Sequence, residues 1–172
     1  MKNNYKEKIR EVKDFPIPNV SFKDITPLLA DTESFRALID DLVGFFKDVQ
    51  VDKVLGIDAR GFLLAAPVAY ALDKGISIVR KKGKLPYQTI VTEHDLEYGR
   101  GTMEIHIDAV KKGEKILIID DVLATGGTAE AAVKLVEKLG GKVVGLGFLL
   151  ELQEFNGRNK IKGHNIQSLI TF

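Results

Sequence analysis

The chain has 172 residues, of which 45% are hydrophobic, enough for one globular domain with a substantial core. Lys and Arg number 25 against 24 Asp and Glu, and a net charge of +1 gives no sign of a nucleic-acid or membrane-surface partner. No apolar run approaches the ~18 residues of a membrane-spanning helix, and the lack of cysteine excludes a disulfide framework. We therefore expect a single cytoplasmic domain spanning residues 1–172.

An extended arm is the first predicted feature. Residues 15–24 read FPIPNVSFKD, and Pro16 and Pro18 forbid a helix there. An extended backbone presents alternating N–H and C=O groups, which can read the edge of a planar ligand. The alternative is a purely structural role, as a proline-rich arm that packs on the sheet.

Short apolar strands then alternate with helical patterns, which is typical of crossover units around a parallel sheet. We predict strands at residues 53–57, 76–79, 115–119 and 143–150, and helices at residues 34–47, 62–72 and 128–139. Pro67 should kink or shorten the second helix, and Gly140 and Gly141 should end the third. The first helix should turn six apolar side chains to the core: Phe35, Leu38, Ile39, Leu42, Phe45 and Phe46.

A loop of small residues with one arginine follows the strand at 53–57. It reads GIDARGF over residues 56–62 and leads into a helix. Helix N-termini favour anions, and a guanidinium adds a fork of donors. The loop therefore suits a second anionic group, although a surface arginine on a tight turn would look the same.

The next segment is crowded with charges. Arg80, Lys81, Lys82 and Lys84 place four positive charges within seven residues, a run that is usually a solvated face. Residues 89–92 and 102–107 alternate well enough to form a hairpin. Because a long charged loop in a compact domain is often functional, we predict a flexible lid over residues 82–101.

The most informative segment reads KILIIDDVLATGGT over residues 115–128. It predicts a buried strand, two adjacent acids, a loop of small residues and a helix N-terminus, which together favour a phosphate. Carboxylates repel phosphate but accept hydrogen bonds from vicinal hydroxyls, so the expected ligand is a ribose 5-phosphate. The alternative is an acidic turn without a ligand, in which Thr125 or Thr128 caps the helix.

These residues resemble the phosphoribosyl diphosphate-binding motif of the type I phosphoribosyltransferases, and five segments of the chain follow that family's order. The resemblance implies an α/β fold with a central, mostly parallel sheet flanked by helices. It adds an N-terminal hood arm over about residues 1–30 and a flexible catalytic loop hairpin. The implied reaction transfers a phosphoribosyl group to a purine nitrogen and releases diphosphate, and members that act on adenine are the most similar.

The resemblance also assigns roles to single residues. Asp120 and Asp121 would bind the ribose hydroxyls. The 5′-phosphate would lie in the loop formed by Ala124, Thr125, Gly126, Gly127 and Thr128. Diphosphate would be bound by Ala59, Arg60, Arg80, Lys81 and Lys84.

Two further sets complete these assignments. Glu97 would interact with the N7/N9 edge of the base and act with Arg60 as a catalytic residue. Adenine would lie against Ser21, Phe22, Lys23 and Leu152. Several relatives have an arginine in place of Lys23 and an aliphatic residue in place of Ser21.

The resemblance further implies Mg²⁺, held mainly through substrate oxygens and water rather than by protein ligands. It implies a homodimer in which basic residues of the lid reach a neighbouring site. Two other functions stay open. One is a phosphoribosyltransferase for another purine base, and the other is a regulator that binds phosphoribosyl diphosphate without turning it over. Such regulators append a DNA-binding unit, for which we see no extra ~70 residues.

Overall fold

The computed structural model describes residues 4–96 and 99–172. Its strands are β1 (Arg10–Lys13), β2 (Ser21–Asp24), β3 (Lys53–Ile57), β4 (Gly75–Lys81), β5 (Thr89–Leu96), β6 (Gly99–His106), β7 (Lys115–Leu123), β8 (Lys142–Glu151) and β9 (Ile166–Thr171). Its α-helices are α1 (Thr26–Ala30), α2 (Thr32–Phe46), α3 (Gly61–Ala71) and α4 (Gly127–Lys138). Three short 3₁₀ helices are η1 (Tyr5–Lys8), η2 (Gln153–Phe155) and η3 (Gly157–Ile161).

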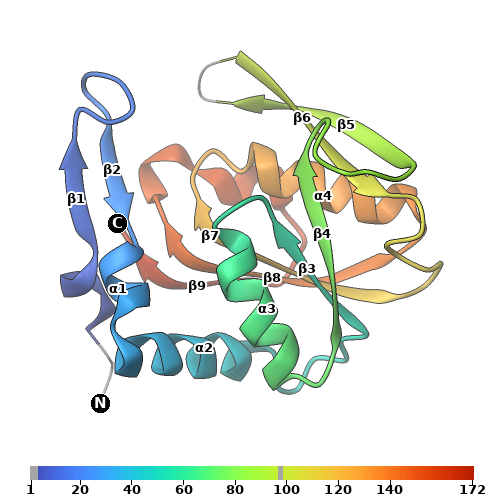
Figure 1. Cartoon of the computed structure of the whole chain (residues 1–172), viewed down its shortest axis with the longest axis horizontal. Helices are drawn as coiled ribbons and strands as arrows, with labels where there is room; N and C mark the ends of the chain where they lie inside the picture. The colour runs from blue at the N-terminus through green and yellow to red at the C-terminus, as the bar shows by residue number, and fades with distance from the viewer. Residues whose placement is uncertain (1–3, 97–98) are drawn as a thin grey trace.

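A seven-stranded sheet crosses the described part of the chain in the order β5-β6-β4-β3-β7-β8-β9 (Figure 1). In that order, the strands from β4 to β9 run parallel to one another, whereas β5 and β6 form an antiparallel hairpin added beside β4. The predicted α/β class with a mostly parallel sheet is therefore confirmed. Separately, β1 and β2 form a two-stranded hairpin at one end of the molecule.

Helices cover both faces of the sheet. Leu117 and Ile119 pack on the side of α2 and α3, and Ile116 and Ile118 pack on the side of α4. This alternation is what a strand buried on both faces requires. Within the described residues, no helix is long and apolar enough to cross a membrane.

All the predicted strands and helices are present, with shifted ends. The strand predicted to stop at residue 119 continues through the two acids to Leu123, because it keeps pairing with β8. The predicted hairpin is β5 and β6, and Gly140 follows the end of α4 with a φ of +83°, as expected of a helix-ending glycine. Sequence periodicity did not predict β1, α1, η3 or β9.

One local expectation is wrong, and the shortening of α3 at Pro67, one part of a second, is not met. Phe45 was expected in the core, but 38% of it is exposed, because Leu42 and Phe46 already occupy the buried face of α2. Pro67 was expected to kink or shorten its helix, yet α3 runs on to Ala71. Four buried side chains hold this helix against the sheet, so packing overrides the poor helix propensity of proline: Leu64, Ala65, Val68 and Ala69.

Phe46 joins α2 to the sheet through two glycines of β8. A Cβ atom on Gly145 would lie 2.6 Å from the Phe46 ring, and one on Gly147 would lie 3.0 Å from it. Phe46 itself is fully buried. The strand therefore leaves out two side chains so that one aromatic ring can pack directly on its backbone.

We predict that Gly145→Ala lowers the free energy of unfolding by ~1–3 kcal/mol, the usual cost of overpacking a core. Gly44→Ala is a matched control, since a Cβ there meets nothing within 4 Å. On an exposed helix position the same change should stabilise by ~0.5–1 kcal/mol. Denaturant titration of both variants measures these opposite changes in the free energy of unfolding. An unchanged stability of Gly145→Ala would contradict the packing argument.

Candidate functional site

A cavity of about 570 Å³ opens at the carboxyl ends of β3 and β7. The two strands pair only as far as Gly56 and Ile119. From there the chain continues to opposite sides of the sheet, toward β4 and toward β8. The cavity thus lies at a topological switch point, where open α/β sheets bind their ligands.

Both predicted anion loops line this cavity. The loop after β3 contributes Ala59 and Arg60, and the end of β7 contributes Asp120 and Asp121. Arg60 Nε lies 2.6 Å from Asp121 Oδ2 in an ion pair. The structure therefore brings the predicted diphosphate arginine and the predicted ribose acids to one site.

The two acids are buried, with 8% and 6% of Asp120 and Asp121 exposed. Burial raises the pKa of Asp120, and the neighbouring charge of Asp121 raises it further. Burial also raises the pKa of Asp121, although Arg60 opposes this. The Asp121 backbone N–H donates to Asp120 Oδ1 at 2.8 Å, whereas Asp121 Oδ2 accepts no hydrogen bond from the described residues. Among the described residues, the Arg60 ion pair is thus the contact that compensates the charge on this oxygen.

Close approach of helix α3 to Asp120 depends on Gly61. A Cβ at Gly61 would lie 2.6 Å from Asp120 Oδ1. The first turn of α3 therefore rests against the carboxylate, and a helix N-terminus next to an acid is favourable electrostatically. Asp120 is held by the fold on one side and faces the cavity on the other.

The loop of small residues wraps the other end of the cavity. Ala124, Thr125, Gly126 and Thr128 line it. Gly126 precedes α4 with a φ of +79°, a left-handed conformation that glycine adopts without strain, and no side chain among the described residues caps this helix. The alternative in which a threonine caps α4 is therefore wrong. The first N–H groups of a helix have no partner within it, so they can point at an anion.

The basic segment, residues 80–84, lies beside this cavity rather than in its wall. Arg80 Nε lies 3.1 Å from Asp58 Oδ2, and Asp58 lines the cavity. Lys81 and Lys84 are exposed and do not line it. Arg80 Nη1 donates to the Lys84 carbonyl at 3.2 Å, which ties the segment together.

Buried Glu104 anchors the turn that follows these cations. Its Oε1 accepts the backbone N–H groups of Lys84 and Leu85 at 2.8 and 2.9 Å. Burial alone would raise the pKa of Glu104, but the backbone donors outweigh it and lower the pKa. The strands of the predicted lid also pack on α4, where Lys138 Nζ donates to the Val91 carbonyl at 3.0 Å.

A second cavity, of about 790 Å³, adjoins the first, and Thr125 lines both. Three of the four predicted base-binding residues line it: Ser21, Lys23 and Leu152. Phe22 does not, because side chains alternate along β2. The Phe22 ring instead stacks against the Arg60 guanidinium, 4.8 Å from its centroid. Phe22 thus contacts the first site rather than the wall of the second.

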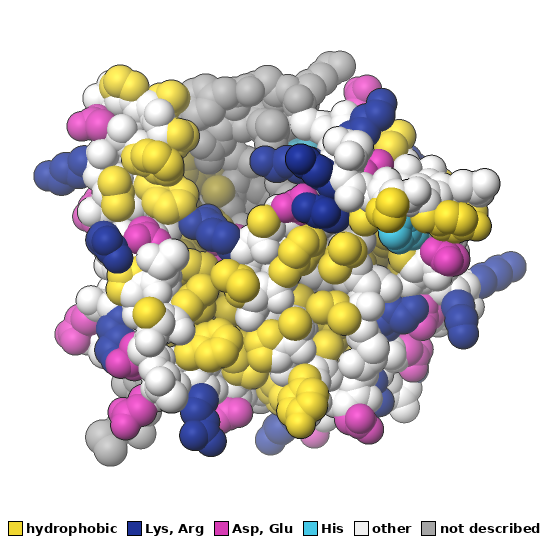
Figure 2. Space-filling model, in the orientation of Figure 1, with side chains coloured by type: hydrophobic (Ala, Val, Ile, Leu, Met, Phe, Trp, Pro, Cys, Tyr) yellow, Lys and Arg dark blue, Asp and Glu magenta, His cyan; other side chains and the backbone are white. Residues whose placement is uncertain are grey.

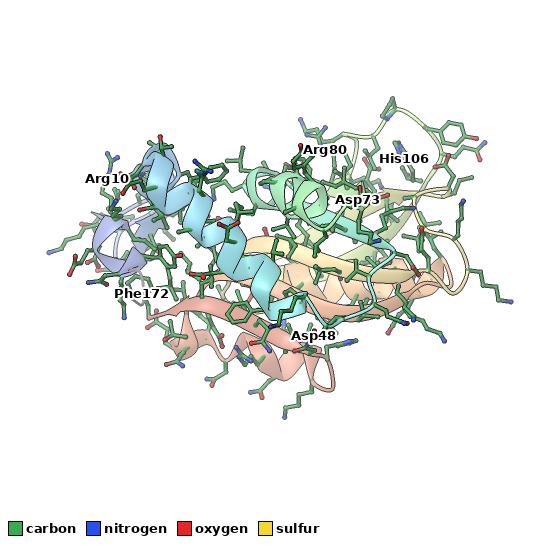
Figure 3. The ribbon with its side chains drawn as sticks, turned by 90° about the horizontal axis from the view of Figure 1, so that it is seen from below. Arg10, Asp48, Asp73, Arg80, His106 and Phe172 are labelled. Atoms are coloured by element: carbon green, nitrogen blue, oxygen red, sulfur yellow. The ribbon has the colours of Figure 1, made fainter. Side chains whose placement is uncertain are left out.

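Sequence reasoning missed two aromatic walls of this second cavity, Phe155 and Phe172. Phe172 lies beside the N-terminal arm, at the opposite end of the molecule from His106 (Figure 3). The Lys23 ammonium lies 5.0 Å from the centroid of the Phe172 ring. No motif surrounds these residues, and only the unpredicted strand β9 brings the chain terminus here.

Glu97, the predicted catalytic acid, lies outside the described residues. Across residues 4–96 and 99–172, no group of three or more His, Asp or Glu side chains could hold a metal ion by itself. The cavity acids are nonetheless hard oxygen donors of the kind that Mg²⁺ accepts alongside water and phosphate oxygens.

The fold defines an α/β protein, and the cavity at its switch point has a lining that suits a phosphorylated ligand. Residues 29–164 match the model of the phosphoribosyl transferase domain, and the chain belongs to this family. It is 52% identical over 169 residues to an adenine phosphoribosyltransferase of Caldicellulosiruptor saccharolyticus, covering 98% of this chain and 97% of that one.

Two solved structures share the whole fold. The adenine phosphoribosyltransferase from Thermoanaerobacter pseudethanolicus superimposes with a TM-score of 0.97 at 47% identity, covering 100% of both chains. The enzyme from Saccharomyces cerevisiae, complexed with adenine and an imino-altritol bisphosphate, superimposes with a TM-score of 0.90 at 34% identity. It covers 98% of this chain and 97% of the yeast one. The type I phosphoribosyltransferase fold implied by the sequence is confirmed.

We predict that Asp120→Asn changes stability in a pH-dependent way. Because the pKa of Asp120 is raised in the folded state, its contribution to stability is present at low pH and lost as pH rises through the folded pKa. The asparagine keeps the Oδ1 acceptor for Asp121 without the charge. The melting temperature of the variant relative to wild type should therefore be higher at about pH 8 than at about pH 5.

Thermal unfolding of both proteins at the two pH values measures this difference. Asp40→Asn, at an exposed position of α2, is the control for loss of one surface charge. An equal difference in melting temperature between Asp120→Asn and wild type at both pH values would mean that Asp120 carries no destabilising charge.

Proposed function

We propose that this protein transfers the phosphoribosyl group of 5-phosphoribosyl 1-diphosphate to adenine, which gives AMP and diphosphate in purine salvage. The observation that carries the proposal is the pair of adjoining cavities. One combines two buried acids with a phosphate-sized loop, and the other is lined by the base-binding segment. A base in the second cavity would lie next to a ribose phosphate in the first.

In this proposal the ribose 5-phosphate occupies the first cavity. Asp120 and Asp121 accept hydrogen bonds from the ribose hydroxyls, and residues 124–128 surround the 5′-phosphate. Two features support this: both acids line the cavity, and α4 starts at its wall. Departure of diphosphate leaves positive charge on the ribose ring, which a pair of carboxylates stabilises.

Diphosphate is assigned to the loop at Ala59 and Arg60 and to the basic segment. Arg60 pairs with Asp121 through Nε, and the other donors of its guanidinium can bind diphosphate oxygens. Arg80 reaches the same loop through Asp58. Mg²⁺ would accompany the diphosphate, held through substrate oxygens and water and neutralising charge on the leaving group.

Adenine is assigned to the second cavity. The backbone of β2 supplies N–H and C=O groups that match the N1 acceptor and N6 donor of the base. Leu152 and Phe155 supply apolar contact. The role of Glu97 as the residue at the N7/N9 edge stays a prediction. Because these substrates are intracellular metabolites, a cytoplasmic place of action belongs to the same proposal.

The decisive test is diphosphate release by the purified protein with magnesium and phosphoribosyl diphosphate, offered one base at a time. We expect turnover with adenine and none with hypoxanthine, guanine, xanthine, uracil or orotate. Turnover with another base would overturn the adenine assignment and keep the ribose phosphate site. Tight binding of phosphoribosyl diphosphate without turnover would place the protein among effector-binding regulators.

We also propose a homodimer formed through α3. The outer face of this helix is apolar, and Leu63 and Tyr70 are 53% and 89% exposed beside Ile76 of β4. Figure 2 shows hydrophobic side chains gathered over the region where Figure 1 places this helix. Monomeric proteins seldom leave such a patch uncovered. A dimer would also give Lys81 and Lys84, which do not line their own cavity, a neighbouring site to serve.

Tyr70→Asp should convert this dimer to a monomer, because it places a charge on the apolar face of α3. Sedimentation velocity of wild type and variant at the same concentration measures the change. Lys134→Asp on α4, which packs on the opposite face of the sheet, is the control and should remain dimeric. A monomeric wild type would contradict the proposed interface.

A further inference from the structure

The segment from Glu151 to Arg158 lies between the second cavity and the loop at residues 124–128. Leu152 and Phe155 line the second cavity, and the Leu152 N–H donates to the Leu123 carbonyl at 2.9 Å, next to the phosphate loop. The same segment then turns through η2 into η3, which packs on α4. One short stretch of chain therefore contacts the base cavity and the loop that is assigned to the 5′-phosphate.

Gly157 is the point of contact with that loop. A Cβ on Gly157 would lie 2.1 Å from the Ala124 carbonyl oxygen, and one on Gly126 would lie 2.3 Å from the Gly157 carbonyl oxygen. The two backbones therefore touch without any intervening side chain. All of these contacts join backbone atoms, which cannot rotate away. A shift of Gly157 toward the loop must therefore move the loop.

Arg158, the next residue, fixes the position of Gly157. Its Nε and Nη2 each lie 2.7 Å from one carboxylate oxygen of Glu151, in a bidentate pair. Its Nη1 donates to the Ile166 carbonyl of β9 at 3.2 Å. Bidentate pairs of this kind restrict geometry as well as adding attraction.

Glu151 is itself immobilised in the sheet. Only 6% of it is exposed, and Ser168 of β9 donates to its Oε2 at 2.8 Å. The hydrogen bonds from Arg158 lower the pKa of Glu151, so the carboxylate is charged at neutral pH. Neither Glu151 nor Arg158 lines either cavity.

We propose that Arg158, through its bidentate pair with Glu151, is a positioning residue for the 5′-phosphate loop. It holds Gly157 against Ala124 and Gly126 and so keeps the loop in the shape that accepts a phosphate. The inference rests on the proposed function, which assigns the 5′-phosphate to this loop.

The test is Arg158→Gln, with ribose 5-phosphate as the probe in isothermal titration. We expect binding to weaken roughly tenfold, because a displaced loop loses contacts that depend on orientation. In turnover assays the KM for phosphoribosyl diphosphate should rise by a similar factor while kcat changes by less than about twofold, the pattern of lost ground-state binding.

Three further variants separate positioning from general stability. Arg36→Gln, an exposed arginine on α2, is the matched control and should bind the probe as wild type does. Arg158→Lys keeps the positive charge but cannot form the bidentate pair, and it should bind ribose 5-phosphate with intermediate affinity. Gly157→Ala leaves the ion pair intact but drives a methyl group into the loop, and it should weaken binding at least as much as Arg158→Gln.

Unchanged ribose 5-phosphate binding in Arg158→Gln, together with a lower melting temperature, would overturn the proposal and leave a structural ion pair. Wild-type affinity for the probe in Gly157→Ala would overturn it as well. Wild-type protein that binds the probe but does not convert adenine would count against the proposed function alone, since the binding comparison still decides the role of Arg158.

Discussion

Much of this structure depends on the burial of two adjacent carboxylates at the carboxyl end of the interior strand β7. Removing charge from water is costly, and two like charges side by side are worse. The protein offsets this with the Arg60 ion pair and the Asp121 N–H, yet the pKa of both acids stays raised and one oxygen lacks a hydrogen bond from the described part of the chain. Such an arrangement weakens the fold, and buried acids with raised pKa values in a cavity are typical of a functional site.

Backbone contact, rather than side-chain packing, sets the shape of the ligand loops. Gly61 lets the start of α3 touch Asp120, and Gly126 and Gly157 let two loops touch each other. A phosphate needs converging N–H groups, which only backbone can supply in such density. Side chains at these glycines would push the segments apart. The same backbone contacts therefore shape the cavity that is assigned to the anion.

The sequence predicted the parts of this site that are local. A strand, two acids, small residues and a helix start are contiguous in residues 115–128, and their order alone implies a sheet-edge anion loop. What it could not predict depends on contacts between distant segments. Phe172 becomes a cavity wall because β9 pairs beside β8, and Phe22 meets Arg60 because the β1–β2 hairpin lies next to the loop that follows β3. The exposed Phe45 shows the same limit, since periodicity cannot say how wide a buried helix face is.

Arg60 connects the two halves of the site. Its guanidinium contacts the Phe22 ring on one side and the Asp121 carboxylate on another, so the arm and the sheet edge share one cation. A ligand that draws Arg60 toward diphosphate oxygens would loosen both contacts, and hydroxyls that occupy Asp121 would make this easier. In the proposed function, the Phe22 backbone belongs to the segment assigned to adenine, so occupation of the first cavity would be linked to the position of the arm. Thr125 lines both cavities, so the two proposed ligands would lie in adjoining space.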